Sequence, residues 1–338
     1  MSTITQNAKP ESPSVIGNLI RRPEFITLVL ILLFAGMVTL INAEAFFSLR
    51  NLFDVLRNLT RVGIFALGTL LVLAAGGIDV SFPAIAAFAL YATSKFVIWL
   101  WPAAPFPFAL VIALAIGVAL GLLNGFFVYR FKVPSLIVTI GTQYLYRGFL
   151  LAFIGTAHIM NIPSSMDDFG RWNLIQTSTA DGVRLTLPMS VLILVLVAGT
   201  TWYILNRTLL GRAVYAVGGS IPIAERLGFS VRTVQLFVFG YAGLLAGLGG
   251  LVHASSNRLA NPFDLVGTEL DVIAAVVLGG ARVTGGTGTV LGTLMGVVLI
   301  IIINNSLILM GVPSTWQKVV IGAIIILASG VFSRRARV

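Results

Sequence analysis

The chain has 338 residues, of which 57% are hydrophobic and 10% are charged. Soluble domains carry about 25% charged residues, so the composition excludes an ordinary soluble domain. The excess of 22 basic over 12 acidic residues is typical of the inner loops that orient membrane proteins, and no polar domain is available to carry a nucleic-acid surface, so no nucleic-acid partner is expected.

Apolar runs predict an all-helical, multi-pass membrane protein with about ten transmembrane helices, because each crossing of the lipid core takes about 20 apolar residues. The second and eighth runs are short and end at Gly76-Gly77 and Gly279-Gly280. Broken backbone in a membrane is tolerated only where it is buried in protein or lines a cavity, so both places deserve a functional interpretation. The runs cover approximately residues 25–41, 62–77, 82–101, 106–129, 134–155, 187–205, 233–252, 269–281, 288–304 and 316–332.

The distribution of Lys and Arg predicts that both termini lie in the cytoplasm. In this orientation thirteen basic residues face the cytoplasm and six face outward, although the outward run from Arg50 to Arg61 goes against the rule. The chain then divides into a cytoplasmic tail (1–24), a transmembrane domain (25–332) and a basic cytoplasmic tail (333–338).

Glycines recur at four-residue spacing in three of the predicted spans. Such rows lie on one helix face and let two backbones approach closely, so we expect tight helix packing there. Residues 76–81 also resemble residues 279–284, but six positions are too few to establish an internal duplication. The glycine rows are Gly117, Gly121 and Gly125; Gly243 and Gly247; and Gly288, Gly292 and Gly296.

The residues that carry most enzyme chemistry are missing or isolated in the sequence. There is no cysteine, and His158 and His253 lack metal-ligand spacing, so neither a catalytic centre nor a metal or other cofactor is expected. No acidic residue falls in the middle of a predicted span, which disfavours an ion-coupled carrier. The pattern G-x-x-x-x-G-K-[ST] is missing as well, so an ATP-driven role requires a second polypeptide. A non-transporting membrane scaffold is the remaining alternative.

The longest predicted cytoplasmic loop, residues 206–232, has the pattern of a short helix, a turn and a second short helix. Gly218-Gly219 fits the turn, and Gly228 fits the end of the second helix. Such a loop is suited to docking on a partner, although an ordinary amphipathic linker has the same pattern. The residues of interest in this loop are Gly211, Arg212, Gly218, Gly219, Ala224, Glu225, Arg226 and Gly228.

Four stretches, in order, resemble the ribose-type sugar permeases of ATP-binding cassette (ABC) importers, which are related to branched-chain amino-acid permeases. Residues 75–81 (AGGIDVS) are similar to the family element A-G-G-I-D-L-S. Residues 133–142 (VPSLIVTIGT), with Arg147-Gly148, are similar to V-P-x-F-I-V-T-L-G-T…R-G. Loop 206–232 resembles the family's coupling loop, and residues 273–296 match I-A-A-V-V-x-G-G-x-x-x-x-G-G-x-G-x-x-x-G-T-x-x-G.

The resemblance implies a type II ABC importer permease of ten helices, with residues 25–332 as the permease domain, that pairs with a second permease copy among the lipids of the bacterial inner membrane. It also implies a cytoplasmic ATPase that docks on loop 206–232 and a periplasmic solute-binding protein, for which the outer loop 156–186 is the candidate contact. Phe82-Pro83-Ala84 stand where the family usually has V-G-[SA], and Ser220 stands where Asn is usual. These departures leave the solute open.

A sugar or polyol offers hydroxyl groups rather than charge, so its path is expected to carry polar, neutral side chains. Asp79 is expected to cap the helix that follows it or to take part in a gate. Interhelical hydrogen bonding is the simpler explanation for any single candidate. A branched-chain amino acid or a nucleoside is the alternative solute. The candidates for path or gate are Asp79, Ser81, Asn124, Thr139, Thr142, Gln143, Asn304 and Asn305.

Overall fold

The computed structural model describes residues 23–179, 182–313, 315–320, 322–323 and 326. Most of the predicted N-terminal tail, most of the tenth predicted span and all of the predicted C-terminal tail lie outside the described residues. The described chain is mostly helical, as predicted, with one two-stranded antiparallel hairpin.

Seven of the described helices are long and apolar enough to cross a membrane: α3, α4, α5, α6 with the π-helical turn η1, α8, α11 and α13. α2 adds a shorter apolar stretch and α12 has ten residues, so nine of the ten predicted runs correspond to a described helix. The elements are α2 (Pro23–Phe46), α3 (Leu49–Ala74), α4 (Phe82–Leu100), α5 (Phe106–Phe131), α6 (Ser135–Phe149), η1 (Leu150–Ile154), α7 (Ser164–Arg171), β1 (Asn173–Ser178), β2 (Arg184–Pro188), α8 (Ser190–Arg207), α9 (Leu209–Gly219), α10 (Ile221–Arg226), α11 (Val231–Asn257), α12 (Glu269–Leu278) and α13 (Val290–Leu309).

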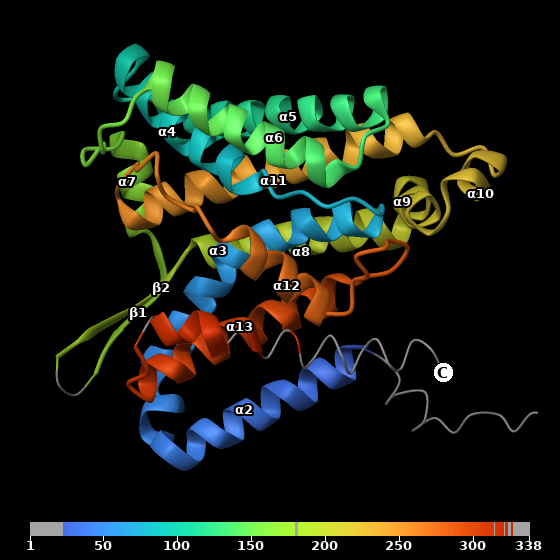
Figure 1. Ribbon diagram of the computed structural model, residues 1–338. Coiled ribbons are helices and arrows are strands. Elements are labelled where there is room, and N and C mark those ends of the chain that lie inside the picture. The colour runs from blue at the N-terminus through green and yellow to red at the C-terminus, as the bar shows by residue number, and fades with distance from the viewer. Residues whose placement is uncertain (1–22, 180–181, 314, 321, 324–325, 327–338) are drawn as a thin grey trace, which may run out of the picture.

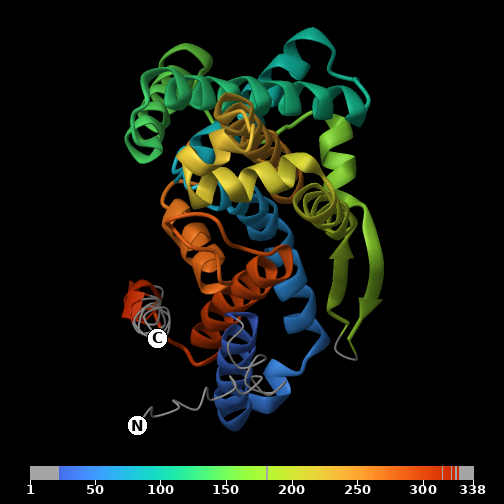
Figure 2. The ribbon, with the colours of Figure 1, turned by 90° about the vertical axis from the view of Figure 1, so that its right-hand side faces the viewer.

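Most of the long helices run along one common direction (Figure 1). The short helices α9 and α10 lie at one end of this bundle, and α7 with the β1–β2 hairpin lies at the other (Figures 1 and 2). We call these the α9–α10 end and the hairpin end. α11 is the central helix. In α11, 78% of an 18-residue apolar stretch is buried, against 22% of the corresponding stretches of α5 and of α6 with η1.

α11 packs against α5 along the predicted glycine rows. A Cβ atom added at Gly117 would overlap the carbonyl oxygen of Gly243, so the two backbones are in direct contact. α12 and α13 meet in the same way, because a Cβ atom at Gly292 would overlap the carbonyl oxygen of Gly279. The predicted close approach of helices at these glycines is confirmed.

The second predicted span is longer than expected and begins earlier. α3 starts at Leu49, where Ser48 Oγ accepts a hydrogen bond from the Asn51 amide at 3.1 Å. The prediction placed Arg50–Arg61 in a loop because of its charges. In the structure these residues form the first turns of α3, and Arg57 donates to the backbone oxygen of Thr186 on β2 at 2.9 Å. The prediction of a short second span over residues 62–77 was therefore wrong.

The α3–α4 and α12–α13 connections begin with the same hydrogen-bond pattern. The Gly77 amide bonds to the Val72 oxygen at 2.9 Å, and the Ala281 amide bonds to the Val276 oxygen at 3.2 Å. Gly76 and Gly280 precede these amides with φ values of 81° and 97°, a region that glycine adopts without strain. The structural correspondence thus pairs Gly76 with Gly280, one position away from the pairing that the sequence suggests.

Candidate functional site

The connection between α3 and α4 is an extended segment, Gly77–Ser81, that runs back along the helices rather than across the end of the bundle (Figure 1). Backbone groups in a membrane protein must find partners inside the protein. Side chains of α6 provide them here. Ser135 Oγ accepts from the Ile78 amide at 2.8 Å, and Thr139 Oγ1 lies 3.3 Å from the Val80 amide and 3.2 Å from the Ile78 oxygen. Two neighbouring turns of α6 therefore take the place of a partner strand.

Asp79 and Ser81 form the centre of a buried hydrogen-bond network. Oδ1 of Asp79 accepts from both the amide and the hydroxyl of Ser81 at 2.7 Å. Asn124 of α5 donates to the Ser81 hydroxyl at 2.7 Å, and Tyr146 of α6 donates to Asn124 Oδ1 at 3.0 Å. Asp79, Ser81 and Asn124 are at most 2% exposed. Among the described residues, Oδ2 of Asp79 has no hydrogen-bond partner.

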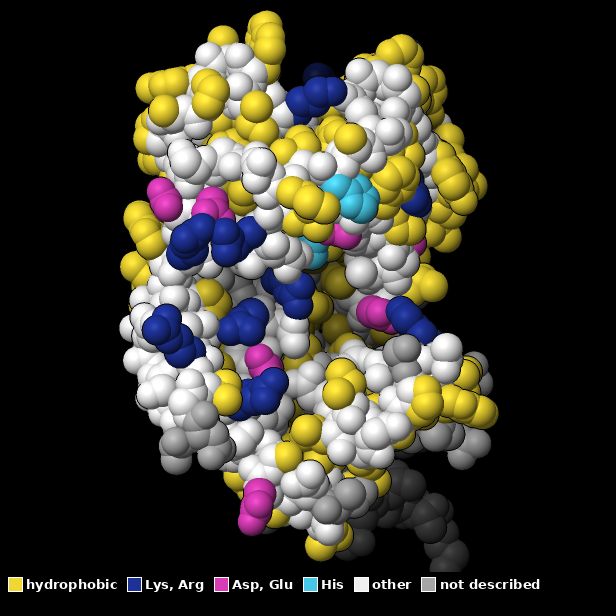
Figure 3. Space-filling model, turned by 90° about the vertical axis from the view of Figure 1, so that its left-hand side faces the viewer, with side chains coloured by type: hydrophobic (Ala, Val, Ile, Leu, Met, Phe, Trp, Pro, Cys, Tyr) yellow, Lys and Arg dark blue, Asp and Glu magenta, His cyan; other side chains and the backbone are white. Residues whose placement is uncertain are grey.

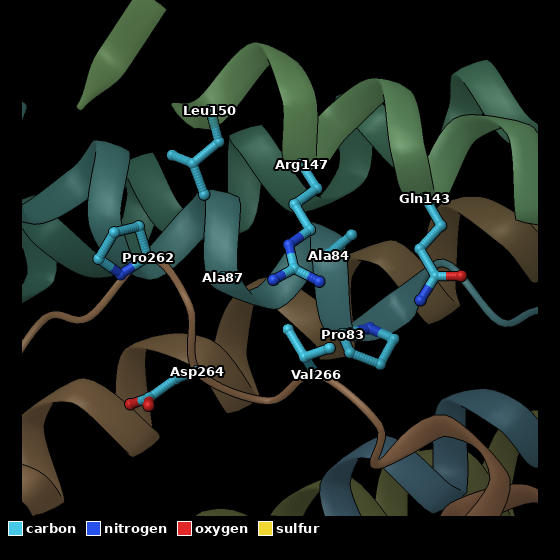
Figure 4. A pocket seen from close by; sticks show the side chains of 9 residues that line it. All are labelled: Pro83, Ala84, Ala87, Gln143, Arg147, Leu150, Pro262, Asp264 and Val266. Carbon is cyan, nitrogen blue, oxygen red and sulfur yellow. The ribbon is translucent and has the colours of Figure 1, made fainter. Parts of the chain in front are cut away.

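Thr142 and Gln143 lie one turn further along α6. The Thr142 hydroxyl is bonded within its own helix, to the Thr139 oxygen at 3.3 Å. Gln143 Nε2 lies 3.4 Å from Glu269 Oε1 at the start of α12. Gln143 and Arg147 line a small pocket and point toward Pro83 and Val266, as Figure 4 shows.

The structure brings two acidic side chains to positions beside the middle of helices. Gln143, the partner of Glu269, lies near the middle of the 20-residue span Ser135–Ile154, and Asp79 reaches Asn124 through Ser81. The expectation concerned residues in the middle of predicted spans, and neither Asp79 nor Glu269 lies in one. It assumed that residues between helices stay at the membrane surface, whereas the segments before α4 and α12 fold back into the bundle.

Asn304 and Asn305 on α13 do not join this group. Asn305 Nδ2 lies 3.3 Å from Asn51 Oδ1 in the first turn of α3, which is an interhelical hydrogen bond. The eight candidate residues thus separate into a cluster on the α3–α4 connection, α5 and α6, and a pair on α13.

At the α9–α10 end, the loop 206–232 contains two short helices, as predicted, but the turn between them was placed wrongly, because Gly218 and Gly219 are the last residues of α9. Ser220 separates α9 from α10 in an extended conformation, and Gly228 follows α10 with a φ of 83°. Ala224 is buried, whereas Arg212, Glu225 and Arg226 are exposed. The apolar side chains of Ile223 and Leu227 are 59% and 66% exposed, so the surface of α10 is apolar as well as charged.

Glycines from three segments meet beside this loop, and we call this contact the glycine junction (Gly76, Gly218, Gly285 and Gly286). A Cβ atom at Gly218 would overlap the Ala74 oxygen and lie 2.7 Å from the Gly286 nitrogen. The Gly286 amide in turn donates to the Ala74 oxygen at 2.9 Å. The end of α9 is therefore in backbone contact with the end of α3 and with the α12–α13 connection.

A cavity of about 520 Å³ opens next to the glycine junction. Its lining includes Gly76-Gly77, Ser135 at the start of α6, Glu225 of α10 and Gln235 of α11. The space between the α9–α10 helices and the extended segment is thus only partly filled.

Several residues of the site were not predicted from the sequence. Tyr146 completes the buried network, Ser135 holds the extended segment, and Glu269 faces Gln143. Tyr215 of α9 donates to the Gly288 oxygen at 2.7 Å and so ties α9 to the α12–α13 connection. Only Ser135 carried a usable signal, since it lies four residues before Thr139 and on the same face of α6.

The hairpin end presents basic side chains together with acidic and histidine side chains (Figure 3). Asp167 of α7 pairs with Arg171 at 2.7 Å and with Arg258, which follows α11. Desolvation opposes the ionisation of Asp167, but hydrogen bonds from Arg258 and Arg171 and their charges hold its pKa below the ordinary value. Asp168 and Arg184 are exposed on the same end.

Comparison with known proteins identifies the class of this chain. The sequence model of a family described as "Branched-chain amino acid transport system / permease component" matches residues 51–329. A ribose import permease protein of Haemophilus influenzae is 33% identical over 311 residues, 92% of each chain. An autoinducer 2 import system permease protein of an Enterobacter species is 32% identical over 91% of this chain and 86% of the relative, and a xylose transport system permease protein of Haemophilus influenzae is 26% identical over 90% and 94%.

No solved structure gives a significant match to the chain. The sequence comparisons are nevertheless sufficient for the class, because the family model covers most of the chain and a relative above 30% identity covers nearly all of it. They also confirm the resemblance that the four sequence motifs indicated. The chain therefore belongs to this family of ABC transporter permease components, and it is a multi-pass membrane protein that is not itself the catalytic subunit.

Proposed function

We propose that the chain forms the translocation path of an importer for a sugar or a similar polyol. The curated relatives named for ribose and xylose support a sugar. Within the described chain, the clearest observation is the glycine junction, which joins the surface helices to the interrupted connections inside the bundle.

The α9–α10 helices are the proposed docking site for a separate cytoplasmic ATPase. Exposed Ile223 and Leu227 give them an apolar surface that a partner groove can cover, with Arg212 and Glu225 beside it. This assignment places the α9–α10 end and both termini in the cytoplasm of a bacterial cell and the hairpin end in the periplasm. A second permease copy completes the path.

The hairpin end is the proposed contact for a periplasmic solute-binding protein. Charge complementarity commonly steers such encounters. Asp167 is already paired with Arg171 and Arg258, so its charge is not free for a partner. Asp168 and Arg184 are exposed and are the better candidates for contact.

The proposed mechanism is alternating access. ATP binding closes the two ATPase subunits, which moves α9 and α10. Because Gly218 is in backbone contact with Gly76 and Gly285, this movement reaches the α3–α4 and α12–α13 connections directly. The bundle then opens its path toward the other side of the membrane.

A branched-chain amino acid is the second candidate solute. The family description names it, and charges of both signs occur near Gln143, since Arg147 lies one turn further along α6 and Glu269 lies 3.4 Å from the Gln143 amide nitrogen. Charged groups at membrane depth commonly mark solute pathways.

The test is uptake of radiolabelled ribose, xylose and leucine by bacteria that express the chain with its ATPase and binding protein. We expect saturable sugar uptake that persists when a protonophore collapses the proton gradient and stops when ATP is depleted. Uptake of leucine without sugar favours the second candidate. Uptake that stops with the gradient while ATP is maintained contradicts both. Cells that express only the two partners are the control.

A further inference from the structure

Tyr146 stands at the start of a chain of hydrogen bonds in which every donor points toward the Asp79 carboxylate. Its hydroxyl proton is shared between the Leu120 oxygen at 2.9 Å and Asn124 Oδ1 at 3.0 Å. Asn124 donates to Ser81, and Ser81 donates to Asp79, both at 2.7 Å. Hydrogen bonds aligned in this way polarise and strengthen one another in a low-dielectric interior.

This chain of hydrogen bonds fixes the one extended segment that links the glycine junction to α4. At one end, Gly76 is in contact with Gly218 of α9. At the other end, Ser81 directly precedes α4. Between them, the segment is held by Ser135 and Thr139 of α6 and, through Ser81, by Asn124 of α5. A segment without helical hydrogen bonds of its own bends or stretches unless such contacts hold it.

We propose that Tyr146 is a positioning residue for transport. Through Asn124 and Ser81 it keeps the Gly77–Ser81 segment stiff, so that a displacement of α9 at the glycine junction moves α4, α5 and α6 together. Without its hydroxyl, the segment absorbs part of the displacement, and ATP is hydrolysed with less solute moved. The inference rests on the proposed function as an ATP-driven importer.

The experiment uses the complete complex of the chain, its ATPase and its binding protein in proteoliposomes, with uptake and stimulated ATP hydrolysis measured on the same preparation. We expect Tyr146→Phe to lower uptake per ATP hydrolysed roughly fivefold, the factor that corresponds to one net buried hydrogen bond. Hydrolysis itself is retained. The matched control is Tyr91→Phe in α4. Tyr91 is 2% exposed and donates to the Ala157 oxygen at 2.8 Å, but it lies outside the network.

Variants of Ser81 separate positioning from a loss of stability. Ser81→Ala removes the same hydrogen-bond chain at its centre, so its effect and that of Tyr146→Phe should not add in the double variant. Ser81→Thr keeps the hydroxyl and should retain most of the coupling. Additive effects, equal behaviour of the Tyr146 and Tyr91 variants, or a proportional fall of uptake and hydrolysis would each overturn the inference. If the wild-type complex shows no ATP-dependent uptake, the proposed function itself fails.

Discussion

Gly218 and Gly219 stand side by side at the end of α9, but only one of them lacks room for a side chain. A Cβ atom at Gly218 would overlap the Ala74 backbone, whereas a Cβ atom at Gly219 meets no atom within 4 Å. Extra volume forced against backbone typically costs about 1–3 kcal/mol. We therefore expect Gly218→Ala to reduce solute uptake at least about fivefold and Gly219→Ala to leave it within about twofold, with both variants inserted equally in the membrane.

The comparison between these two neighbours checks the glycine junction itself. Both substitutions remove a glycine from the same turn and change helix propensity alike. Equal uptake by the two variants, at equal amounts in the membrane, would show that the backbone contact between α9 and α3 plays no part in transport.

Among the single residues of the site, the sequence indicated Asp79 and Ser81 but not Tyr146. Asp79 and Ser81 stood out because they belong to a motif that follows an apolar run. Tyr146 did not, because a tyrosine in an apolar stretch has the same pattern whether it packs or donates a hydrogen bond. Its role depends on the path of the Gly77–Ser81 backbone, which side-chain periodicity does not encode.

Among the elements, α6 combines two tasks, since it is a membrane-spanning helix and also satisfies the backbone of the extended segment. Ser135→Ala leaves the Ile78 amide without its partner, and an unsatisfied buried group costs about 1–3 kcal/mol. We expect this variant to lower the Tm of the detergent-purified chain by several degrees.

Thr142→Val serves as the reference for that measurement. The Thr142 hydroxyl bonds to the Thr139 oxygen of its own helix, so its loss leaves no backbone amide unpaired. A Tm for Ser135→Ala that matches the Tm of Thr142→Val would mean that water or another group replaces Ser135, and the role assigned to α6 would be wrong.

The helices were predictable where length and apolar character coincide, as in α5, α8 and α11. The start of α3 was not, because Arg50, Arg57 and Arg61 are typical of a loop, although all three lie in the helix and Arg57 contacts β2. The hairpin and α7 were also missed. Polar stretches carry little periodic signal, and the pairing of β1 with β2 depends on the turn between them.

For the molecule as a whole, the proposed orientation has a direct test, because the chain contains no cysteine. A membrane-impermeant maleimide should label a Ser178→Cys variant, at the hairpin, in intact cells with a permeable outer membrane. A Gly219→Cys variant should be labelled only after the inner membrane is opened. The wild-type chain gives the unlabelled background, and the reverse pattern would contradict cytoplasmic placement of the α9–α10 end.

The order of the helices could be predicted better than the position of the segments that connect them. Counting apolar runs led to most of the described helices, and the orientation drawn from the basic residues stays a prediction. The apolar runs did not reveal that the segments before α4 and α12 return into the bundle and bring Asp79 and Glu269 beside α5 and α6. Depth in the membrane is a property of the folded connections, and an apolar run reports only on the residues within it.

The extended segment also has a consequence for synthesis. Ser135 follows Ile78 by 57 positions, so at about 5–20 residues per second the ribosome delivers it roughly 3–11 seconds later. During that interval the Gly77–Ser81 backbone has no α6 to bind, and α5 is completed only shortly before α6 begins. The newly made α3–α4 pair must therefore wait at the insertion machinery or the membrane surface until α6 emerges, which makes the order of helix release part of how this protein reaches its fold.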